Sequence, residues 1–254
     1  MSGSAILHIM QKAAEKAAFL LIRDFGELEK LQVSRKGFRN FVTSADRNAE
    51  ARIIHELTKY HPEYSFVCEE SGLTEKEDKN TAWIIDPIDG TSNFMRGIPY
   101  FAINIALRKG NDVVAGITLD PMRGECYKAE IGQGALGGRS RLRVSGREDI
   151  REALIATRGS VQFGEQLVGL GAIIRKTGSV AMDMAYLSAG KYDAVIARNV
   201  YLWDIASGIV LIKEAGGFIE LSKIGSSQYN LVAASSKKLL TTCLSCLGNA
   251  NVRR

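Results

Sequence analysis

The stretch Asp86-Pro87-Ile88-Asp89-Gly90-Thr91 decides how the rest of this 254-residue chain is interpreted. It places two carboxylates three residues apart and follows them with a glycine, a hydroxyl and an expected helix start. The preceding Trp83-Ile84-Ile85 has the character of a buried strand, which would deliver Asp86 at its carboxyl end, where ligands of open α/β sheets commonly bind. Because Mg²⁺ prefers carboxylate oxygens and leaves other positions to water and phosphate, the stretch predicts a site for magnesium and a phosphate.

Hydrophobic periodicity predicts the surrounding elements. A first helix is expected over residues 4–25, and a second is expected to begin at Ser44 or Asp46, which are good N-caps, and to end near Tyr60. Strands are predicted at 66–68, 83–85, 101–108, 113–119, 126–128, 142–144, 154–157, 172–175, 192–197, 218–221 and 231–234, and helices at 163–170, 179–189, 204–215 and the C-terminal end. Short turns among the strands from 101 to 128 indicate antiparallel neighbours, and the later alternation indicates sheets between helices.

The composition is that of an ordinary soluble globular protein, with 46% hydrophobic and 24% charged residues. The net charge of +5 suits an anionic substrate or partner. The basic run from Arg139 to Arg151 contains acidic residues and no aromatic ones, which favours a solvated face over a nucleic-acid surface. No apolar run approaches the about 20 residues that span a bilayer, so we expect no membrane span and no signal peptide, and we predict a cytoplasmic protein.

The four cysteines are too few and too scattered for a disulfide framework, which fits a reducing compartment. Cys243 and Cys246 form a C-x-x-C pair. A zinc site would need two more ligands, and the three histidines lie far away in the sequence. We therefore interpret both cysteines as apolar positions of the final helix.

Acidic residues stand at four predicted strand ends or helix starts: Asp46, Glu69 with Glu70, Asp86 with Asp89, and Asp204. Taken singly, Asp46 and Asp204 are equally well explained as N-caps, and the glutamate pair as a solvated turn. Of the four, only the run from Asp86 to Thr91 indicates a functional site when it is considered by itself.

Residues 84–94, IIDPIDGTSNF, resemble the first signature of the inositol monophosphatase family. Residues 203–208, WDIASG, with the closing EAGG of 214–217, resemble its second signature. Further matches occur at residues 42–46, 69–71, 141–145 and 177–183. Two specific signatures more than 100 residues apart, in the right order, argue against chance agreement.

The resemblance implies a mixed α/β (α+β) fold, a layered α/β/α/β/α sandwich, and a homodimer. Residues 1–254 are expected to form a single unit, with a metal-binding half of about 1–148 and a substrate-side half of about 149–254. A boundary near 145–152 is plausible, although no flexible linker is present there.

Carried over residue by residue, the family pattern assigns one Mg²⁺ to Glu69, Asp86 and the backbone carbonyl of Ile88. Asp86 would bridge to a second ion held also by Asp89 and Asp204, and two or three ions are expected in all. In such a clamp, the ions screen the phosphate charge, bind the leaving oxygen and lower the pKa of an attacking water.

The resemblance also implies roles around the metal ions. Glu69 and Thr91 would orient the water, and Asp46 would accept the hydrogen bond that turns the Thr91 hydroxyl. The backbone N–H groups of Gly90 and Thr91, at the start of a short helix, would face the phosphate. Further substrate contacts are expected from Ser179, Val180 and Asp183, where the helix near residue 179 begins. Asp183 is a candidate contact for a polyol hydroxyl and is equally well explained as a structural residue.

The sequence departs from the family at one position that concerns the substrate. Inositol phosphatases of the family usually place a glutamate seven residues before the aspartate of the second signature, where it hydrogen-bonds substrate hydroxyls. Here that residue is Ala197, followed by Arg198. Either a neighbour compensates for the glutamate or its loss is tolerated, or inositol selectivity is weakened. Glu70 has no metal role in the pattern, and Lys36, expected in a loop, could reach the phosphate.

These features predict a Mg²⁺-dependent phosphomonoester hydrolase acting on inositol 1-phosphate or a related small polyol phosphate, with lithium inhibition expected from the family. Ser92-Asn93-Phe94 is closer to the monophosphatase branch than the Lys-Glu-Phe of the adenosine bisphosphate branch. Two alternatives stay open. One is a binding protein that assists RNA polymerase, as in a bacterial branch of the family, with hydrolysis secondary. The other is a phosphatase for another sugar or nucleotide phosphate.

Overall fold

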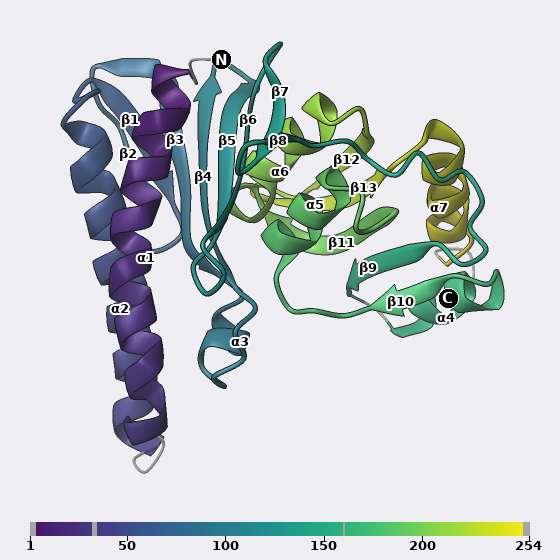
Figure 1. The fold of residues 1–254 in the computed structure, drawn as a ribbon, viewed down its shortest axis with the longest axis horizontal. Helices are drawn as coiled ribbons and strands as arrows, with labels where there is room; N and C mark the ends of the chain where they lie inside the picture. The colour runs from purple at the N-terminus through teal and green to yellow at the C-terminus, as the bar shows by residue number, and fades with distance from the viewer. Residues whose placement is uncertain (1–3, 32–34, 160, 251–254) are drawn as a thin grey trace.

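The computed structural model describes residues 4–31, 35–159 and 161–250, with side chains described throughout these ranges except at 29–43, 161–163 and 247–250. Two sheets make up its centre (Figure 1). The first contains, in spatial order, β2 (Gly72–Thr74), β1 (Tyr64–Cys68), β3 (Asp78–Asp89), β4 (Ala102–Lys109), β5 (Asp112–Asp120), β6 (Glu125–Glu130), β7 (Gly134–Gly137) and β8 (Ser140–Arg141). The second contains β10 (Ile173–Arg175), β9 (Leu154–Arg158), β11 (Ala194–Tyr201), β13 (Gln228–Ala234) and β12 (Phe218–Ile224).

Helices cover both sheets and fill the space between them (Figure 1). The long helices α1 (Ala5–Leu31) and α2 (Arg35–Thr58) lie side by side on the outer face of the first sheet. Helices α5 (Val180–Ser188) and α6 (Leu202–Glu214) lie between the sheets, and α4 (Val161–Gly169) and α7 (Lys237–Ala250) lie beyond the second. This order is the α/β/α/β/α sandwich that the resemblance implied.

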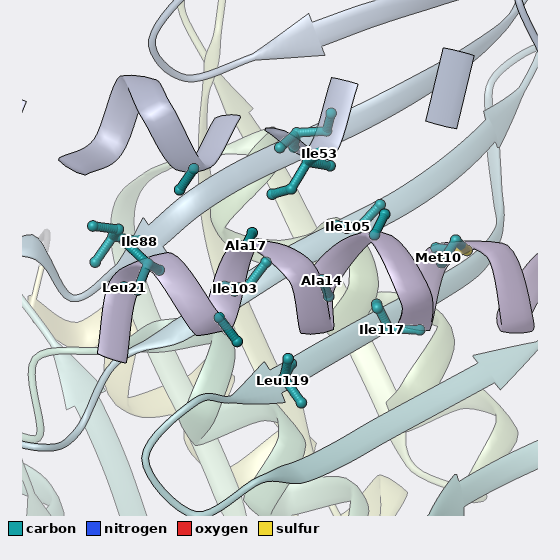
Figure 2. Packing of buried hydrophobic residues seen from close by; sticks show 14 of the residues in the cluster. Met10, Ala14, Ala17, Leu21, Ile53, Ile88, Ile103, Ile105, Ile117 and Leu119 are labelled. Carbon is teal, nitrogen blue, oxygen red and sulfur yellow. The ribbon is translucent and has the colours of Figure 1, made fainter. Parts of the chain in front are cut away.

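The outer layer is held by the apolar face of α1. Met10, Ala14, Ala17 and Leu21 are buried against isoleucine and leucine side chains of β4 and β5 (Figure 2). Full burial of each large aliphatic side chain contributes about 1.5–3 kcal/mol, and the alanines let the helix approach the sheet closely. Since β3 is the neighbour of β4, this packing also fixes the strand that carries the site.

Helix α6 is fixed to the first sheet at close range. A Cβ added to Gly116 on β5 would lie 2.6 Å from the Cα of Ser207, so only glycine fits there. The Asn104 side chain of β4 donates to the carbonyl oxygen of Trp203 at 2.5 Å, and the buried hydroxyls of Thr118 and Ser207 lie 2.7 Å apart. These contacts position the first turn of α6 beside the end of β3.

Several elements differ from the sequence-based prediction. The first helix continues to Leu31, and the strands β2 and β7 were not predicted. The second helix begins at Arg35, so Ser44 and Asp46 lie inside it and not at its start. The strand predicted at 142–144 is not formed, and β8 ends at Arg141. Leu142 and Val144 donate their N–H groups to different elements, at Ala135 and Ala215, so no continuous ladder results.

Cys68, Cys126, Cys243 and Cys246 are buried free thiols. The last two pack into the core beneath α7, which confirms their interpretation as apolar positions of the final helix. None of the helices in the described ranges combines the length and apolar character that crossing a bilayer requires.

Candidate active site

The end of β3 brings two carboxylates to one place. In a regular strand, residues three apart point to opposite faces. Here the pairing with β4 shifts register between Asp86 and Asp89, and this bulge turns both side chains the same way. The Ile88 N–H within the bulge donates to Asp86 Oδ1 at 3.0 Å, which fixes the first carboxylate.

The third carboxylate comes from α6. Asp204 lies in the first turn of this helix, and its Oδ2 accepts the Tyr201 N–H at 3.0 Å. Carboxylate oxygens of Asp86, Asp89 and Asp204 all lie within 4.8 Å of one another, and all three residues are buried. This confirms that the two sequence signatures meet in space. Three converging oxygen ligands of this kind fit a hard divalent cation such as Mg²⁺.

Asp89 is held by the start of α5. The Ser179 hydroxyl donates to Asp89 Oδ2 at 2.5 Å, and the Ala181 N–H donates to the same oxygen at 2.7 Å. Because both hydrogen bonds fall on one oxygen, the other oxygen of the carboxylate can serve an ion.

The electrostatics of the cluster follow from burial and crowding. Burial raises the pKa of Asp89 to about 8, and the neighbouring Asp204 adds to this effect. Burial, followed by repulsion from Glu69 and the other acids, raises the pKa of Asp86 well above its usual value. The pKa values of Glu69 and Asp204 are also raised, mainly by burial. Such a cluster is costly to ionise without a compensating cation, which is typical of a functional site.

The carboxylates open into a cavity of about 310 Å³. Its lining comes from both halves of the chain: Glu69, Asp86, Ile88, Asp89, Gly90, Thr91, Ser92, Arg158, Gly178 and Asp204. Gly90 has a φ of +105° and caps the short helix α3 (Thr91–Phe94), which forms where the sequence predicted it. A Cβ at this position would lie 3.2 Å from both the Cβ of Phe101 and the carbonyl oxygen of Tyr100, so glycine is required.

The Thr91 hydroxyl has a different partner from the expected one. It donates to the carbonyl oxygen of Ile88 at 3.1 Å, whereas the sequence predicted Asp46 as acceptor. A hydroxyl has one proton, so in this conformation it is committed to the bulge, which leaves that carbonyl oxygen one lone pair for an ion. Asp46 is buried within α2, and burial together with Glu70 and Glu69 raises its pKa to about 8.

The turn that carries Glu69 is held by a residue that the sequence reasoning missed. The buried carboxylate of Glu50 accepts the N–H groups of Glu70 and Ser71, each at 3.0 Å. Its position four residues after Asp46 on the same helix could have indicated it. Glu70 lies 3.7 Å from Arg47 in a loose ion pair. Lys36 lies in α2, and its side chain is outside the described part of the structure.

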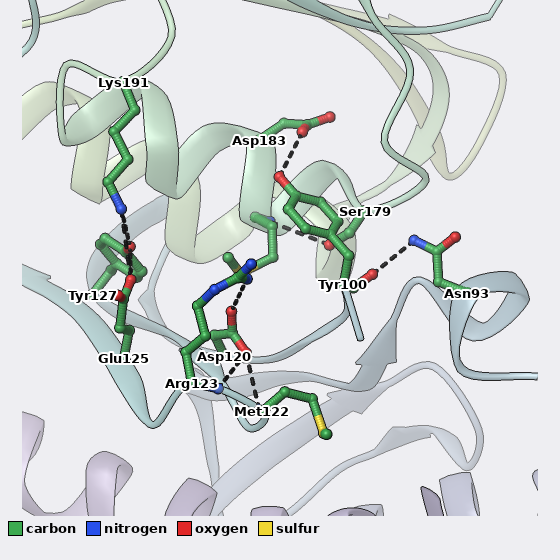
Figure 3. A network of polar contacts seen from close by, with 11 residues as sticks. Asn93, Tyr100, Asp120, Met122, Arg123, Glu125, Tyr127, Ser179, Asp183 and Lys191 are labelled. Atoms are coloured by element: carbon green, nitrogen blue, oxygen red, sulfur yellow. Dashed lines mark hydrogen bonds and ion pairs between the residues drawn. The ribbon is translucent and has the colours of Figure 1, made fainter. Parts of the chain in front are cut away.

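The residues predicted to contact substrate at α5 are buried. Ser179, Val180 and Asp183 do not belong to the cavity lining, although Gly178 does. Figure 3 shows the hydroxyl of Tyr100 directed at the Asp183 carboxylate, which it contacts at 3.2 Å, and Thr177 donates to the same oxygen at 2.7 Å. Burial outweighs these hydrogen bonds and raises the pKa of Asp183 to about 7. Ser179 thus contacts Asp89, and a substrate role for the three residues stays a prediction.

Comparison with known proteins identifies the family. The profile of the Inositol monophosphatase family matches residues 4–247. The chain belongs to the inositol monophosphatase family. It is 44% identical over 239 residues to the inositol-1-monophosphatase of Caulobacter vibrioides, which covers 89% of this chain and 93% of that protein. It is also 38% identical over 225 residues to the Nus factor SuhB of Escherichia coli K12, covering 84% of each.

Solved structures of this inositol monophosphatase family share the fold. The crystal structure of the extragenic suppressor protein suhB from Bartonella henselae superposes with a TM-score of 0.87 at 34% identity, covering 97% of this chain and 99% of that one. The inositol monophosphatase from Anabaena gives a TM-score of 0.82 at 27% identity, covering 96% and 95%. The α/β/α/β/α sandwich is therefore that of the family.

Proposed function

We propose that this chain is a Mg²⁺-dependent phosphomonoester hydrolase that acts on inositol 1-phosphate or a related small polyol phosphate. The observation that carries the proposal is the convergence of Asp86, Asp89 and Asp204 within 4.8 Å, buried beside a cavity of about 310 Å³. A purely structural role would not require three uncompensated carboxylates in one buried place.

The proposed ligands are Glu69, Asp86, the Ile88 carbonyl oxygen, Asp89 and Asp204, which would hold two or three Mg²⁺ ions. Bound Mg²⁺ supplies charge neutralisation at the phosphate, stabilisation of the leaving oxygen and a water of lowered pKa. The chain supplies the geometry. The bulge at Ile88 and the first turn of α6 fix the carboxylates before any substrate enters.

The remaining roles fall to residues at the cavity wall. The N–H groups of Gly90 and Thr91 are proposed to bind the phosphate oxygens, and glycine admits the close approach. Glu69 and the Thr91 hydroxyl are proposed to orient the attacking water. Rotation about χ1 of Thr91 would release its hydroxyl from the Ile88 carbonyl oxygen. We propose that Asp46 then accepts the hydrogen bond from this hydroxyl.

The experiment is a phosphate-release screen over inositol, glycerol, sugar and nucleotide phosphates with Mg²⁺. Asp89→Asn should abolish turnover and weaken Mg²⁺ binding measured by calorimetry, with an unchanged circular dichroism spectrum. Asp193→Asn is the matched control, because Asp193 is a buried acid whose partners, Ser145, Arg147 and the Leu154 N–H, lie outside the cavity lining. Sustained hydrolysis by the Asp89→Asn variant would refute the assignment of Asp89 as a Mg²⁺ ligand.

Both halves contribute to the cavity lining, which supports a single functional unit. We propose that residues 1–148 form the metal-binding half, to which Asp204 adds one ligand, and that residues 149–254 form the substrate-side half. A homodimer in the cytoplasm and inhibition by lithium complete the proposal, in line with the family. Sedimentation analysis tests the dimer, and phosphate release in the presence of Li⁺ tests the inhibition.

The second candidate is association with the transcription machinery. Relatives at 33–38% identity are named Nus factor SuhB, which is the observation in its favour. Co-purification of RNA polymerase with wild-type protein and with Asp89→Asn separates this function from hydrolysis. Retention by both proteins would show that association does not depend on the metal site.

A further inference from the structure

Arg158 is the exceptional residue of the cavity. Among the described residues that form the lining, it alone carries a positive charge, whereas four others are carboxylates. It stands at the end of β9 in the second sheet, while Asp86 and Asp89 come from the first. The proposed function assigns roles to the carboxylates and leaves this guanidinium unexplained.

The strand register shows what lies beside it. Arg158 is the Cα partner of Ala197 in the parallel pairing of β9 with β11. Partners in a ladder direct their side chains to the same face. Ala197 is fully buried and ends in a methyl group, so it offers no hydrogen-bond acceptor. Ala197 does not line the cavity, so Arg158 is the polar side chain that β9 presents there, and its ladder partner adds no acceptor.

Arg158 is only loosely held. Its Nη1 lies 3.3 Å from Asp204 Oδ2, and half of its side chain is exposed. A long, half-exposed contact through one nitrogen is a weak ion pair. If Asp204 serves a metal ion, as proposed above, its charge is no longer available to the guanidinium. The planar donor fork of arginine then fits another carboxylate or phosphate group.

We infer that Arg158 contacts the substrate and selects phosphomonoesters whose alcohol part carries a second anionic group, either a carboxylate or a second phosphate. The inference rests on the proposed hydrolysis of a phosphomonoester and moves the preferred substrate from a neutral polyol phosphate to an ester with an anionic alcohol part. The transferred phosphate is assigned to Gly90 and Thr91, which follow the end of β3, whereas Arg158 ends β9 of the second sheet, and we therefore assign it to the other end of the ester.

The test compares esters that differ in the second group. Inositol 1-phosphate and glycerol 2-phosphate have a neutral alcohol part and are called the neutral esters here. In 3-phosphoglycerate the alcohol part carries a carboxylate, and in fructose 1,6-bisphosphate it carries a second phosphate. The wild-type protein should prefer one anionic class. Arg158→Ala should raise the KM for the preferred anionic ester about 10–100-fold, as expected for loss of a charge-assisted pair. It should change the KM for the neutral esters less than about threefold. Arg158→Lys should retain part of the preference.

Arg151→Ala is the matched control. Arg151 is also an exposed arginine with a carboxylate partner, Asp149 at 2.5 Å, but it does not line the cavity. Its substitution should change neither KM. Thermal unfolding of each variant reports whether the fold is intact.

A binding measurement without turnover separates this inference from the proposed function. Phosphonoacetate carries a carboxylate that methylphosphonate lacks, and neither is a phosphate ester. Calorimetry with Mg²⁺ present should show tighter binding of phosphonoacetate by wild type, and Arg158→Ala should remove the difference. If the bisphosphate is the preferred ester, methylenediphosphonate replaces phosphonoacetate.

The outcomes are distinct. Equal loss for every ester would overturn the inference, because Arg158 would then bind the transferred phosphate or act structurally. Equal KM values in wild type and Arg158→Ala would also overturn it. If wild type hydrolyses no ester, the proposed function fails, and the phosphonate comparison still decides whether Arg158 recognises a second anion.

Discussion

Replacing Ser179 with alanine should disturb a helix cap and the proposed metal ligand Asp89 at once. The buried hydroxyl accepts the Met182 N–H at 3.3 Å as the N-cap of α5, and it donates to Asp89 Oδ2 at 2.5 Å. Loss of an N-cap costs about 1 kcal/mol. Loss of the second hydrogen bond costs about 1 kcal/mol in metal-free protein at neutral pH, where the raised pKa of Asp89 keeps it largely protonated.

The sum is about 2 kcal/mol in the free energy of unfolding. For a protein of this size, each kcal/mol lowers the melting temperature by about 2–4 °C, so Ser179→Ala should melt about 4–8 °C lower. Side chains that orient metal ligands typically change metal affinity about 10–100-fold when removed. Mg²⁺ affinity should therefore fall by this factor, as measured by calorimetry.

Ser188→Ala is the matched control for this substitution. Ser188 is a buried serine of the same helix, and its hydroxyl donates to the Ala185 carbonyl oxygen at 2.7 Å. It should leave Mg²⁺ affinity unchanged, and Ser179→Thr should recover most of the wild-type affinity. Wild-type Mg²⁺ affinity in Ser179→Ala, or equal weakening in Ser188→Ala, would refute the assignment of Ser179 as the residue that orients Asp89.

Three further tests concern the same region. Gly90→Ala adds a Cβ 3.2 Å from that of Phe101 at a φ of +105°, so denaturant unfolding should show a loss of about 2 kcal/mol and phosphate release should fall about tenfold or more. In metal-free protein, burial raises the pKa values of Asp46 and Asp89 from 3.8 to about 8. Their stabilising contribution is therefore complete below about pH 4 and lost as the pH rises through about 8. The melting temperature without Mg²⁺ should fall over this range and recover when Mg²⁺ is added. Burial raises the pKa of Asp183 to about 7, so its stabilising contribution declines between about pH 4 and pH 7. In Mg²⁺-saturated protein, Asp183→Asn should therefore flatten the decline of the unfolding free energy over this range. An unchanged slope would exclude Asp183 as the source of the decline.

The residues themselves indicated Asp86 and Asp89 as a site, whereas Asp204 was assigned to it only through the family resemblance. Asp86 and Asp89 follow a buried apolar strand, and Asp204 begins a helix with clear periodicity. The sequence did not predict the register shift that turns the first two carboxylates to one side. That shift depends on pairing with β4, which is a long-range property.

The residues that hold the cluster were harder to predict. Arg158 stands 46 residues before Asp204 in the sequence. It ends β9 of the second sheet, whereas Asp204 lies in α6, and no local sequence pattern distinguishes it from other arginines. Ser179 was expected to be a substrate contact from the family resemblance. The structure places its hydroxyl on Asp89, since α5 lies between the sheets and its first turn faces the end of β3. Tertiary packing, and not propensity, decides such contacts.

The three central carboxylates share one local arrangement, and its chemistry explains why the site suits a cation. Asp86 is fixed by the Ile88 N–H, Asp89 by the Ser179 hydroxyl and the Ala181 N–H, and Asp204 by the Tyr201 N–H. Each of these donors is uncharged, so it orients an acid without cancelling its charge. A structural ion-pair network would instead have placed a lysine or arginine against each carboxylate. Among the described residues that line the cavity, the single guanidinium is that of Arg158, which lies 3.3 Å from Asp204 and remains half exposed. The fold therefore fixes the positions of three acids and leaves most of their negative charge to be balanced by something that the chain itself does not provide.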